Sequence, residues 1–407
     1  MYYLLGEKLG HSYSPQIHRH LGEYTYKLLE KAPDQLGDFL KNGTFSGLNV
    51  TIPYKKSVIP YCDALTPIAA RLGAVNTIIR QSDGSLLGHN TDYFGFETML
   101  KRSGLQVQGK KVLVLGTGGA SQTAVAVLQD HGAQVVAVSR TGENHYGNLF
   151  LHQDAAVIVN ATPVGMYPHA GSAPLSLALF PQLEGVLDCI YNPTRTKLLM
   201  DADTHGIVAM NGLLMLVAQA KEGAEWFTGR KIPDERIDAI YTTLQKQMTN
   251  ILLIGMPGSG KSTIGSLLAR KTGKRFVDAD VAFEEKVGCS PAAFLETKGE
   301  AAFRALETEV LAELGQQSGL VLATGGGCVT KEENYPHLHQ NGSIFWLDRC
   351  IDSLATQGRP LSQATPLTKI YRIRAPLYAR FADYKVDNNG TPEETVSNIL
   401  HIWEEQL

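Results

Sequence analysis

The sequence predicts an α/β protein in which parallel sheets are flanked by helices. Two segments carry this prediction, since each reads as a short aliphatic strand, a glycine-rich loop and a helix: "KKVLVLGTGGASQTAVAVLQDHG" from Lys110 and "TNILLIGMPGSGKSTIGSLLARKTG" from Thr249. A short aliphatic run is typical of a parallel strand that is buried on both faces. Each helix is expected to end near a glycine, Gly132 or Gly273, because glycine suits a helix C-terminus.

The composition is that of a globular protein with no unusual charge. Of its 407 residues, 43% are hydrophobic and 19% are charged, and 37 basic against 40 acidic residues give a formal charge of -3. A basic excess would favour nucleic acid or an anionic membrane as a partner, and the sequence has none. No apolar run reaches the length of a membrane span, the first residues lack the pattern of a signal peptide, and the five cysteines form no CxxC pair. We therefore expect a cytoplasmic protein with reduced thiols and no nucleic-acid or membrane partner.

Strand and turn patterns divide the chain into domains. Before Leu100, "GLNVTIPYKK" predicts a strand that runs into a turn at Pro53, and "AVNTIIR" and "LLGHNTD" flank the turn signal "SDG" as the strands of a hairpin would. We assign residues 1–100 to a front α/β domain, which a helical return at 207–240 completes, and residues 101–206 to a dinucleotide-type domain. Residues 241–248 are predicted to be a short polar linker, and residues 249–407 a third domain with a parallel sheet.

The loop "GTGGAS", which begins at Gly116, predicts a dinucleotide site at the start of a helix. Its glycines permit a tight turn and a close approach of a pyrophosphate to the backbone amides. The next strand, "AQVVAVSRT", ends in Ser139, Arg140 and Thr141, whereas a site for NAD would end in Asp or Glu to hold the ribose hydroxyls. A cation suits the 2′-phosphate of NADP. The alternative is a nucleotide-free domain with a tight turn, and the combined pattern favours the cofactor.

Seven strings around this loop follow one another in an order that carries a resemblance. "GHSYSPQIH", "NVTIPYK", "GAVNT" and "GHNTDYFG" precede the loop, and "NATPVGMYP", "DCIYNPTRTKLL" and "NGLLMLVAQA" follow it. Their order and spacing resemble shikimate dehydrogenase over nearly all of the first 247 residues. The resemblance implies a two-domain unit with a Rossmann-type NADP domain that reduces 3-dehydroshikimate to shikimate with NADPH. Both Ser12 and Ser14 are present, which favours shikimate over quinate and leaves dual use open.

The chemistry of this reaction fits the residues that the strings contain. Reduction of a ketone needs a hydride and a proton for the developing alkoxide; Lys55 can supply the proton and Asp92 can orient the lysine, and the resemblance makes them the catalytic pair. By resemblance, the substrate-binding residues are Ser12, Ser14, Thr51, Asn76, Asp92, Tyr191 and Gln219, most of which offer the hydroxyl and amide groups that a small polyol acid requires. The cofactor-binding residues are Gly116, Thr117, Gly118, Gly119, Ala120, Ser139, Arg140, Thr141 and Gly212. Ser139 stands where NADP-specific members carry Asn, and no second basic residue follows, so the selectivity for NADP over NAD stays open.

The second loop, "GMPGSGKS" from Gly255 to Ser262, fits the phosphate-binding pattern G-x-x-x-x-G-K-[S/T]. The backbone amides of Gly258 to Lys261 should cradle the β-phosphate, Lys261 should reach the β- and γ-phosphates, and the Ser262 hydroxyl should ligate Mg²⁺. The motif alone does not choose among a motor, a switch and a small-molecule kinase. The absence of an N-K-x-D string argues against a GTPase switch.

The strings after this loop resemble shikimate kinase over essentially all of residues 248–407. "FVDAD" is expected to place Asp278 and Asp280 on one face at the end of a strand, "KGEAAFRALE" places Arg304 on a helix, and "LATGGGCV", "QGRPLS" and "RAPLY" follow. The resemblance implies that Asp278 and Ser262 bind the metal and that the catalytic residues are Lys261, Asp280 and Arg359, which lies on a lid. The ATP-binding residues are Gly258, Ser259, Gly260, Lys261, Ser262, Thr263 and Arg359, and the substrate-binding residues are Asp280, Arg304, Gly326 and Arg374. The lid is shorter than in many relatives, and Ser362 replaces the usual leucine.

Together, the two resemblances predict a bifunctional enzyme of consecutive steps. The first unit would use NADP(H) to make shikimate, and the second would use ATP and Mg²⁺ to phosphorylate shikimate at its 3-hydroxyl; the chain is expected to be a monomer or a homodimer. The late position of the phosphate loop and the methionine at position 248 indicate a gene fusion. Two alternatives remain: a regulator that senses the same metabolites without turnover, and a fusion with only one active half. The four residues whose loss a regulator would predict, Lys55, Asp92, Lys261 and Asp278, are all present.

Overall fold

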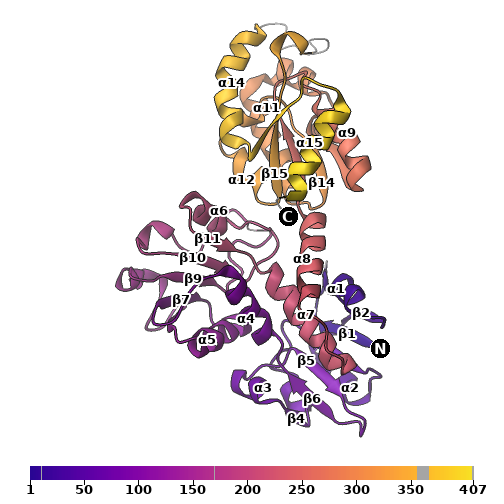
Figure 1. The fold of residues 1–407 in the computed structure, drawn as a ribbon, viewed down its shortest axis with the longest axis vertical. Helices are drawn as coiled ribbons and strands as arrows, with labels where there is room; N and C mark the ends of the chain where they lie inside the picture. Colours follow the sequence, from indigo (N-terminus) through magenta and orange to yellow (C-terminus); the bar gives the residue numbers. More distant parts are fainter. Residues whose placement is uncertain (11, 169, 355–365, 406–407) are drawn as a thin grey trace. The chain divides into compact units, whose positions relative to one another are not determined.

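The computed structural model describes residues 1–10, 12–168, 170–354 and 366–405. The chain divides into two compact units, of which the first contains residues 1–191 and 196–241 and the second contains residues 192–195 and 242–407. Three sheets organise these units, two in the first and one in the second (Figure 1).

The first sheet has six strands in the order β2-β1-β3-β5-β6-β4. Its strands are β1 (Tyr2–Gly6), β2 (Tyr26–Glu30), β3 (Gly47–Val50), β4 (Ala64–Leu65), β5 (Thr77–Arg80) and β6 (Leu86–His89). Strands β5 and β6 pair antiparallel with Thr77 opposite His89, which confirms the predicted hairpin. Strand β3 is buried along its whole length, as the string "GLNV" indicates, and the chain turns directly after it. The helices and turns between these strands are α1 (Ser14–Leu21), α2 (Pro33–Asn42), η1 (Ile59–Tyr61) and α3 (Pro67–Leu72).

The second sheet has five parallel strands in the order β11-β10-β9-β7-β8. They are β7 (Lys111–Leu115), β8 (Gln134–Val138), β9 (Val157–Asn160), β10 (Gly185–Asp188) and β11 (Val208–Met210). The connecting helices and turns are α5 (Gly119–Asp130), η2 (Tyr146–His152), η3 (Leu177–Leu179) and α6 (Lys197–Thr204). The predicted strand, glycine loop and helix are therefore present as β7, the loop at 116–118 and α5. Residues 207–240, which were predicted to be a helical return, begin with strand β11. The sequence did not predict this strand, because three residues are too few to show a strand pattern.

Helices α4 (Asp92–Ser103) and α7 (Leu213–Thr228) pack against each other within the first unit. A Cβ added to Gly95 of α4 would lie 2.7 Å from the carbonyl oxygen of Met215, so this contact requires glycine. A Cβ on Gly47 of β3 would lie 2.7 Å from the ring of Phe227, which shows that the end of α7 covers the first sheet. Helix α8 (Glu235–Met248) follows, and it includes residues 241–248, which were expected to be a linker.

The third sheet, in the second unit, has five parallel strands in the order β13-β14-β12-β15-β16. They are β12 (Asn250–Ile254), β13 (Arg275–Asp278), β14 (Leu320–Ala323), β15 (Gly342–Asp348) and β16 (Tyr384–Asp387). The helices are α9 (Lys261–Thr272), α10 (Ala279–Val287), α11 (Pro291–Gly315), α12 (Asn334–His339), α14 (Leu367–Phe381) and α15 (Pro392–Glu405), with short turns η4 (Cys328–Thr330) and η5 (Ile351–Ser353). Helix α9 ends at Gly273 in the left-handed conformation, as the sequence predicts.

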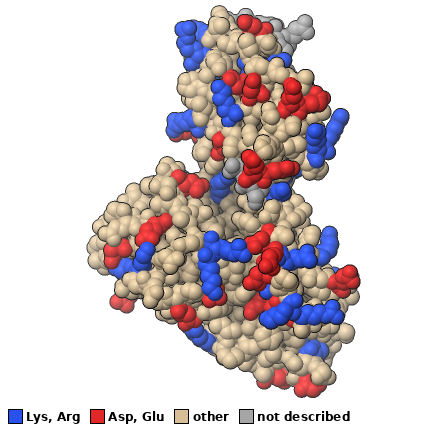
Figure 2. Space-filling view, in the orientation of Figure 1, with Lys and Arg blue, Asp and Glu red and all other residues tan. Residues whose placement is uncertain are grey.

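Two observations concern the surface and the length of the helices. Acidic and basic side chains are interspersed on the visible face in Figure 2. In the ranges that the structure covers, we find no helix both long and apolar enough to cross a membrane.

Candidate active sites

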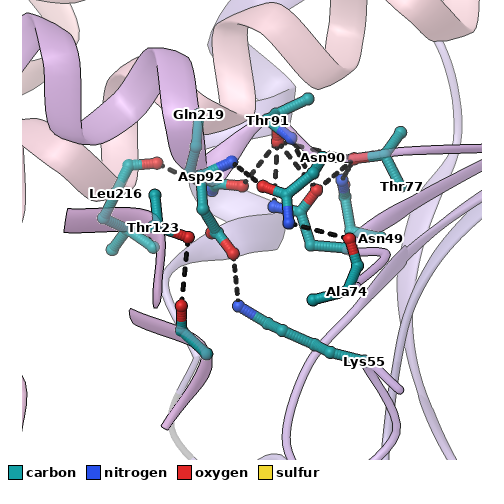
Figure 3. A network of polar contacts seen from close by, with 12 residues as sticks. Asn49, Lys55, Ala74, Thr77, Asn90, Thr91, Asp92, Thr123, Leu216 and Gln219 are labelled. Carbon is teal, nitrogen blue, oxygen red and sulfur yellow. Dashed lines mark hydrogen bonds and ion pairs between the residues drawn. The ribbon is translucent and has the colours of Figure 1, made fainter. Parts of the chain in front are cut away.

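The first site is built around an ion pair between Lys55 and Asp92 (Figure 3). Lys55 lies in the turn after β3, and Asp92 is the first residue of α4. Their atoms Nζ and Oδ2 are 2.6 Å apart, and the two side chains are 23% and 10% exposed. The structure thus brings the predicted catalytic pair together, in a place where the lysine keeps contact with solvent and the carboxylate is nearly covered.

Asp92 is held in place by its neighbour Asn90, a residue that the sequence analysis did not single out. The Asn90 side chain accepts a hydrogen bond from the Asp92 amide at 3.0 Å and donates one to the carbonyl of Ala74 at 2.9 Å. Asn90 is 1% exposed, so these bonds form in a nearly dry environment. The string "GHNTD" contains this residue, and an Asn two positions before a helix start is a recognisable capping signal.

Asn76 and Gln219, both predicted to bind substrate, belong to the same polar network. The Asn76 Oδ1 atom accepts from the Thr91 amide at 2.7 Å, and its Nδ2 donates to the Thr91 hydroxyl at 3.0 Å. The Thr91 hydroxyl lies 3.4 Å from Oε1 of Gln219, which α7 carries. The network therefore joins the first sheet, α4 and α7 beside Lys55 (Figure 3).

Four further predicted substrate residues lie near the starts and ends of other elements. The Ser14 amide donates to the Ser12 hydroxyl at 3.2 Å at the start of α1. The Thr51 amide donates to the carbonyl of Leu5 at 2.9 Å just after β3. Tyr191 follows β10, its ring meets that of Tyr13 edge-on at 6.2 Å, and burial raises the pKa of its phenol. These side chains are outside the hydrogen-bonded network of Figure 3.

The glycine loop before α5 adjoins Lys55, the predicted proton donor. A Cβ on Gly119 would lie 3.8 Å from Cδ of Lys55, so the loop and the ion pair are neighbours. Gly116 has φ = 107°, which favours glycine, and its carbonyl accepts from the Ser121 hydroxyl at 2.6 Å. A Cβ on Gly118 would meet open space, which leaves room for a ligand at the N-terminus of α5. Thr117 is exposed and Ala120 is half-buried beside these glycines.

The remaining predicted cofactor residues lie at the ends of β8 and β11. Ser139, Arg140 and Thr141 follow β8; Arg140 and Thr141 are exposed, and the Ser139 hydroxyl donates to the Thr141 carbonyl. A Cβ on Gly212 would lie 2.2 Å from the carbonyl oxygen of Cys189, so only glycine fits where the chain enters α7. The exposed Arg140 after β8 and the backbone amides at the start of α5 are groups that suit the phosphates of a dinucleotide.

Asp188 is a buried carboxylate that the sequence analysis did not identify. It is fully buried at the end of β10, and it accepts hydrogen bonds from Nδ2 of Asn160 at 3.0 Å, the amide of Ile190 at 3.0 Å and the hydroxyl of Thr196 at 2.7 Å. Burial raises its pKa to about 6, although the three donors favour the ionised form. Its bonds fix the segment that carries Tyr191. No local pattern in "LDCIYNP" shows that this aspartate is buried.

The second site is a cavity of about 490 Å³ at the carboxyl ends of β12, β13 and β14 in the third sheet. It is lined by most of the residues predicted for the kinase: Gly258, Gly260, Lys261, Ser262, Thr263, Asp278, Asp280, Arg304, Gly326 and Arg374. The Lys261 ammonium donates to the carbonyls of Gly255 and Met256, each at 3.0 Å, and the side chain is buried. Gly260, with φ = 88°, forms the N-cap of α9 and lines the cavity.

Ser262 and Asp278 provide oxygen ligands of the kind that Mg²⁺ prefers. The Ser262 hydroxyl donates to Oδ2 of Asp278 at 2.5 Å across the cavity floor. Among the residues that the structure describes, no group of three or more His, Cys, Asp or Glu side chains could hold a metal ion. One carboxylate and one hydroxyl suit an ion whose other ligands are waters and the phosphates of a nucleotide, which is the usual mode for Mg²⁺.

Asp280 lies in the cavity, but the prediction that it shares a strand face with Asp278 is wrong. Strand β13 ends at Asp278, whose Oδ1 atom accepts from the Asp280 amide at 3.0 Å and so begins α10. Asp280 is in the first turn of that helix. The cap bond of an aspartate at a strand end, rather than strand alternation, brings the two carboxylates together.

Arg304 is buried beside Glu307, a residue that the sequence analysis missed. Nη1 of Arg304 is 2.7 Å from Oε2 of Glu307, and the two side chains are 6% and 7% exposed. Burial raises the pKa of Glu307, and Arg304 opposes this shift. The guanidinium also packs against Gly327, where a Cβ would lie 2.2 Å from Nη2. Helical i,i+3 spacing in "FRALE" is the signal that could have indicated this pair.

Arg374 and the phosphate loop are fixed by further contacts. Nη1 of Arg374 donates to the carbonyl of Gly326 at 3.1 Å, which holds this predicted substrate residue at the cavity wall. Ser259 is fully buried, and its carbonyl accepts from the Asn388 side chain, which in turn accepts from Thr395 at 2.8 Å. Arg359 and Ser362, both assigned to a lid, lie outside the described residues.

Comparisons with known proteins address the two units separately. The family descriptions "Shikimate dehydrogenase substrate binding domain" and "Shikimate kinase" match residues 4–78 and 257–404. The shikimate dehydrogenase (NADP(+)) of Clostridium perfringens (strain SM101 / Type A) is 36% identical over 264 residues, which cover 60% of this chain and 97% of the relative. The crystal structure of shikimate dehydrogenase 1 from Peptoclostridium difficile is 38% identical with a TM-score of 0.55 and covers 60% of this chain and 97% of its own. Shikimate 5-dehydrogenase from Thermus thermophilus in complex with NADP(H) and shikimate is 30% identical with a TM-score of 0.55, and covers 60% of this chain and 98% of its own.

Proposed function

Because the chain belongs to the shikimate dehydrogenase family over 60% of its length and matches shikimate kinase after that, we propose that it catalyses both reactions in sequence. The first unit reduces 3-dehydroshikimate to shikimate with NADPH, and the second transfers the γ-phosphoryl group of ATP to the 3-hydroxyl of shikimate. The observation that carries the proposal is that each predicted reacting group lies beside its predicted cofactor or nucleotide loop: Lys55 beside Gly119, and Asp280 in the cavity with Lys261.

In the reduction, the residues of the chain handle the proton and the position of the ketone. Bound NADPH supplies the hydride. The Lys55 ammonium donates its proton to the carbonyl oxygen as that oxygen becomes a hydroxyl, and Asp92, 2.6 Å away, keeps the ammonium oriented. Asn76 and Gln219 provide amide groups for the hydroxyls of the ring, and Ser12 and Ser14 bind its carboxylate. Arg140 holds the 2′-phosphate of the cofactor.

In the phosphorylation, charged side chains act on both partners. Arg304 and Arg374 bind the carboxylate of shikimate, and Asp280 accepts the proton of the attacking 3-hydroxyl. Lys261 leaves the carbonyls of Gly255 and Met256 to contact the β- and γ-phosphates. Ser262 and Asp278 would hold Mg²⁺, which would supply positive charge to offset the negative charge of the phosphates.

The test is one assay with two readouts. The purified chain is supplied with 3-dehydroshikimate, NADPH and MgATP, and both NADPH oxidation and the formation of shikimate 3-phosphate are followed. We expect NADPH oxidation without ATP to yield shikimate, and addition of MgATP to convert it to shikimate 3-phosphate. Turnover of neither NADPH nor ATP would support the alternative of a metabolite-sensing regulator, and turnover of only one of them would support a fusion with one active half.

A further inference from the structure

A chain of buried polar side chains runs behind the substrate side of the first site. It begins at Tyr26 of β2, whose hydroxyl donates to Oδ1 of Asn49 at 2.8 Å, and Nδ2 of Asn49 donates to the Thr77 hydroxyl at 3.1 Å. The Thr77 hydroxyl donates to Oδ1 of Asn76 at 3.1 Å. Thr77 is fully buried, and Asn49 and Asn76 are 5% and 3% exposed. Asn49, Thr77 and Thr91 are visible together in Figure 3.

The number of protons on each group orients most bonds of this network, whereas the Thr77 and Thr91 hydroxyls, 3.4 Å apart, can donate to each other in either direction. A backbone amide can only donate, so the Thr91 amide, 2.7 Å from Asn76, identifies the facing atom as Oδ1. A threonine hydroxyl has one proton, and Thr77 receives a hydrogen bond from Asn49, so its proton is available to Asn76 Oδ1. The Asn76 amide therefore has its oxygen turned to Thr77 and Thr91, and its nitrogen turned to the Thr91 hydroxyl. Nδ2 carries a second hydrogen besides the one that faces Thr91.

We propose that Thr77 is a positioning residue for the reduction: together with the Thr91 amide, which faces the same Oδ1 atom, it holds the Asn76 side chain so that Asn76 offers the substrate a donor rather than an acceptor. Thr77 is too deeply buried to touch the substrate itself. Helix α7 closes the back of this chain, because a Cβ on Gly223 would lie 3.1 Å from Nδ2 of Asn49. The proposal rests on the proposed dehydrogenase activity of the first unit and adds a residue that directs one of its binding groups.

Two substitutions at one position separate this role from simple packing. Thr77→Val keeps the shape and removes the hydroxyl, whereas Thr77→Ser keeps the hydroxyl and removes a methyl group. We expect Thr77→Val to lower kcat/KM for 3-dehydroshikimate by about tenfold, mainly through KM, because Asn76 keeps its bond to the Thr91 amide but loses the one to Thr77. We expect Thr77→Ser to stay within about twofold of the wild type, and KM for NADPH to be unchanged in both.

The opposite ranking would overturn the proposal. If Thr77 only fills space, the isosteric Val is tolerated and the smaller Ser is the damaging change, since a buried methyl is lost. An unchanged KM for NADPH reports that the first unit is intact, and the pair Thr228→Val and Thr228→Ser, at an exposed helix end, serves as a matched control.

The melting temperature of the first unit tests the same ranking without turnover. If the Thr77 hydroxyl holds the hydrogen-bonded side chains together, the Thr77→Val variant melts at a lower temperature than the Thr77→Ser variant. The reason is that Val leaves the buried Asn49 and Asn76 side chains with one hydrogen-bond partner fewer each, and the reverse order contradicts the proposal. A wild-type chain that oxidises no NADPH would reject the proposed function, while the order of the melting temperatures would still decide whether Thr77 holds this chain of hydrogen bonds.

Discussion

Lys55 and Lys261 each lie beside a glycine-rich loop, but their surroundings differ. Lys55 pairs with the carboxylate of Asp92 at 2.6 Å and is 23% exposed, and the groups behind that carboxylate are neutral amides and hydroxyls. Lys261 is buried, bonds to two backbone carbonyls, and shares its cavity with Asp278, Asp280, Glu307, Arg304 and Arg374. The first site thus surrounds a single ion pair with neutral hydrogen-bonding groups, whereas the second brings several charged side chains together in one cavity.

The largest effect is expected at Lys55, the proposed proton donor of the first site. Replacement of Lys55 by Ala removes the group that protonates the developing alkoxide, and general acid catalysis is worth roughly 10² to 10⁴ in rate. We expect kcat for NADPH oxidation to fall about a thousandfold, with the phosphorylation of added shikimate unchanged. Lys56→Ala, which changes the exposed neighbour, is the matched control and should retain full activity. A Lys55→Ala chain that still oxidises NADPH at the wild-type rate would show that the proton comes from elsewhere.

The corresponding change in the charged site is Lys261→Ala. It removes a positive charge from the phosphates during transfer, and such electrostatic contributions are worth roughly 10² to 10³ in kcat. We expect shikimate phosphorylation to fall by a few hundredfold while NADPH oxidation is kept, which is the mirror image of Lys55→Ala. Lys271→Ala, near the exposed end of the same helix, controls for the loss of a lysine from α9. Unchanged phosphorylation would exclude Lys261 from the transfer.

A smaller effect is expected from the buried carboxylate of Glu307, which tests whether this carboxylate is needed to hold Arg304 in position. Glu307→Gln keeps the shape and leaves the buried Arg304 guanidinium without its charged partner at 2.7 Å. We expect KM for shikimate to rise roughly 10- to 30-fold with kcat changed less, because the arginine that binds the substrate carboxylate is no longer held. Glu309→Gln, on the exposed side of α11, is the control. An unchanged KM would mean that the longer ion pair with Glu300, at 3.6 Å, and the packing against Gly327 are enough to position Arg304.

The sequence predicted local features of both sites well and the buried partners poorly. Strand, glycine loop and helix in order are enough to place Gly116, Gly119 and Lys261, because these features depend on neighbouring residues only. Whether a polar side chain is buried depends on what other segments bring against it. Asp188 receives bonds from Asn160 on another strand, and the sequence gives no indication of this contact.

The placement of Asp280 shows a different kind of limit. The Asp280 side chain points in one direction if the strand continues through it and in another if a helix begins before it. The end of β13 at Asp278 decides for the helix. Alternation along a strand was the wrong rule for "FVDAD", because Asp278 caps the next helix instead of continuing the strand. Both carboxylates still line the cavity, so the error concerned how they come together and not which residues do.

The smallest effect concerns the one cation that the first unit is predicted to use for its cofactor. Arg140 follows β8 and its side chain is exposed, so its bond to a 2′-phosphate competes with water and salt. We expect Arg140→Ala to raise KM for NADPH about fivefold and to leave KM for NADH unchanged, and Arg140→Lys to keep about half of the preference because a charge remains without the planar guanidinium. The measurement is the ratio of kcat/KM for NADPH to that for NADH at low and at high salt. If this ratio does not change with Arg140→Ala, the preference for NADPH over NADH comes from the backbone of the loop at Ser139–Thr141 and not from the charge of Arg140. The two sites would then differ in the surroundings of Lys55 and Lys261, and not in the use of a cation for the cofactor.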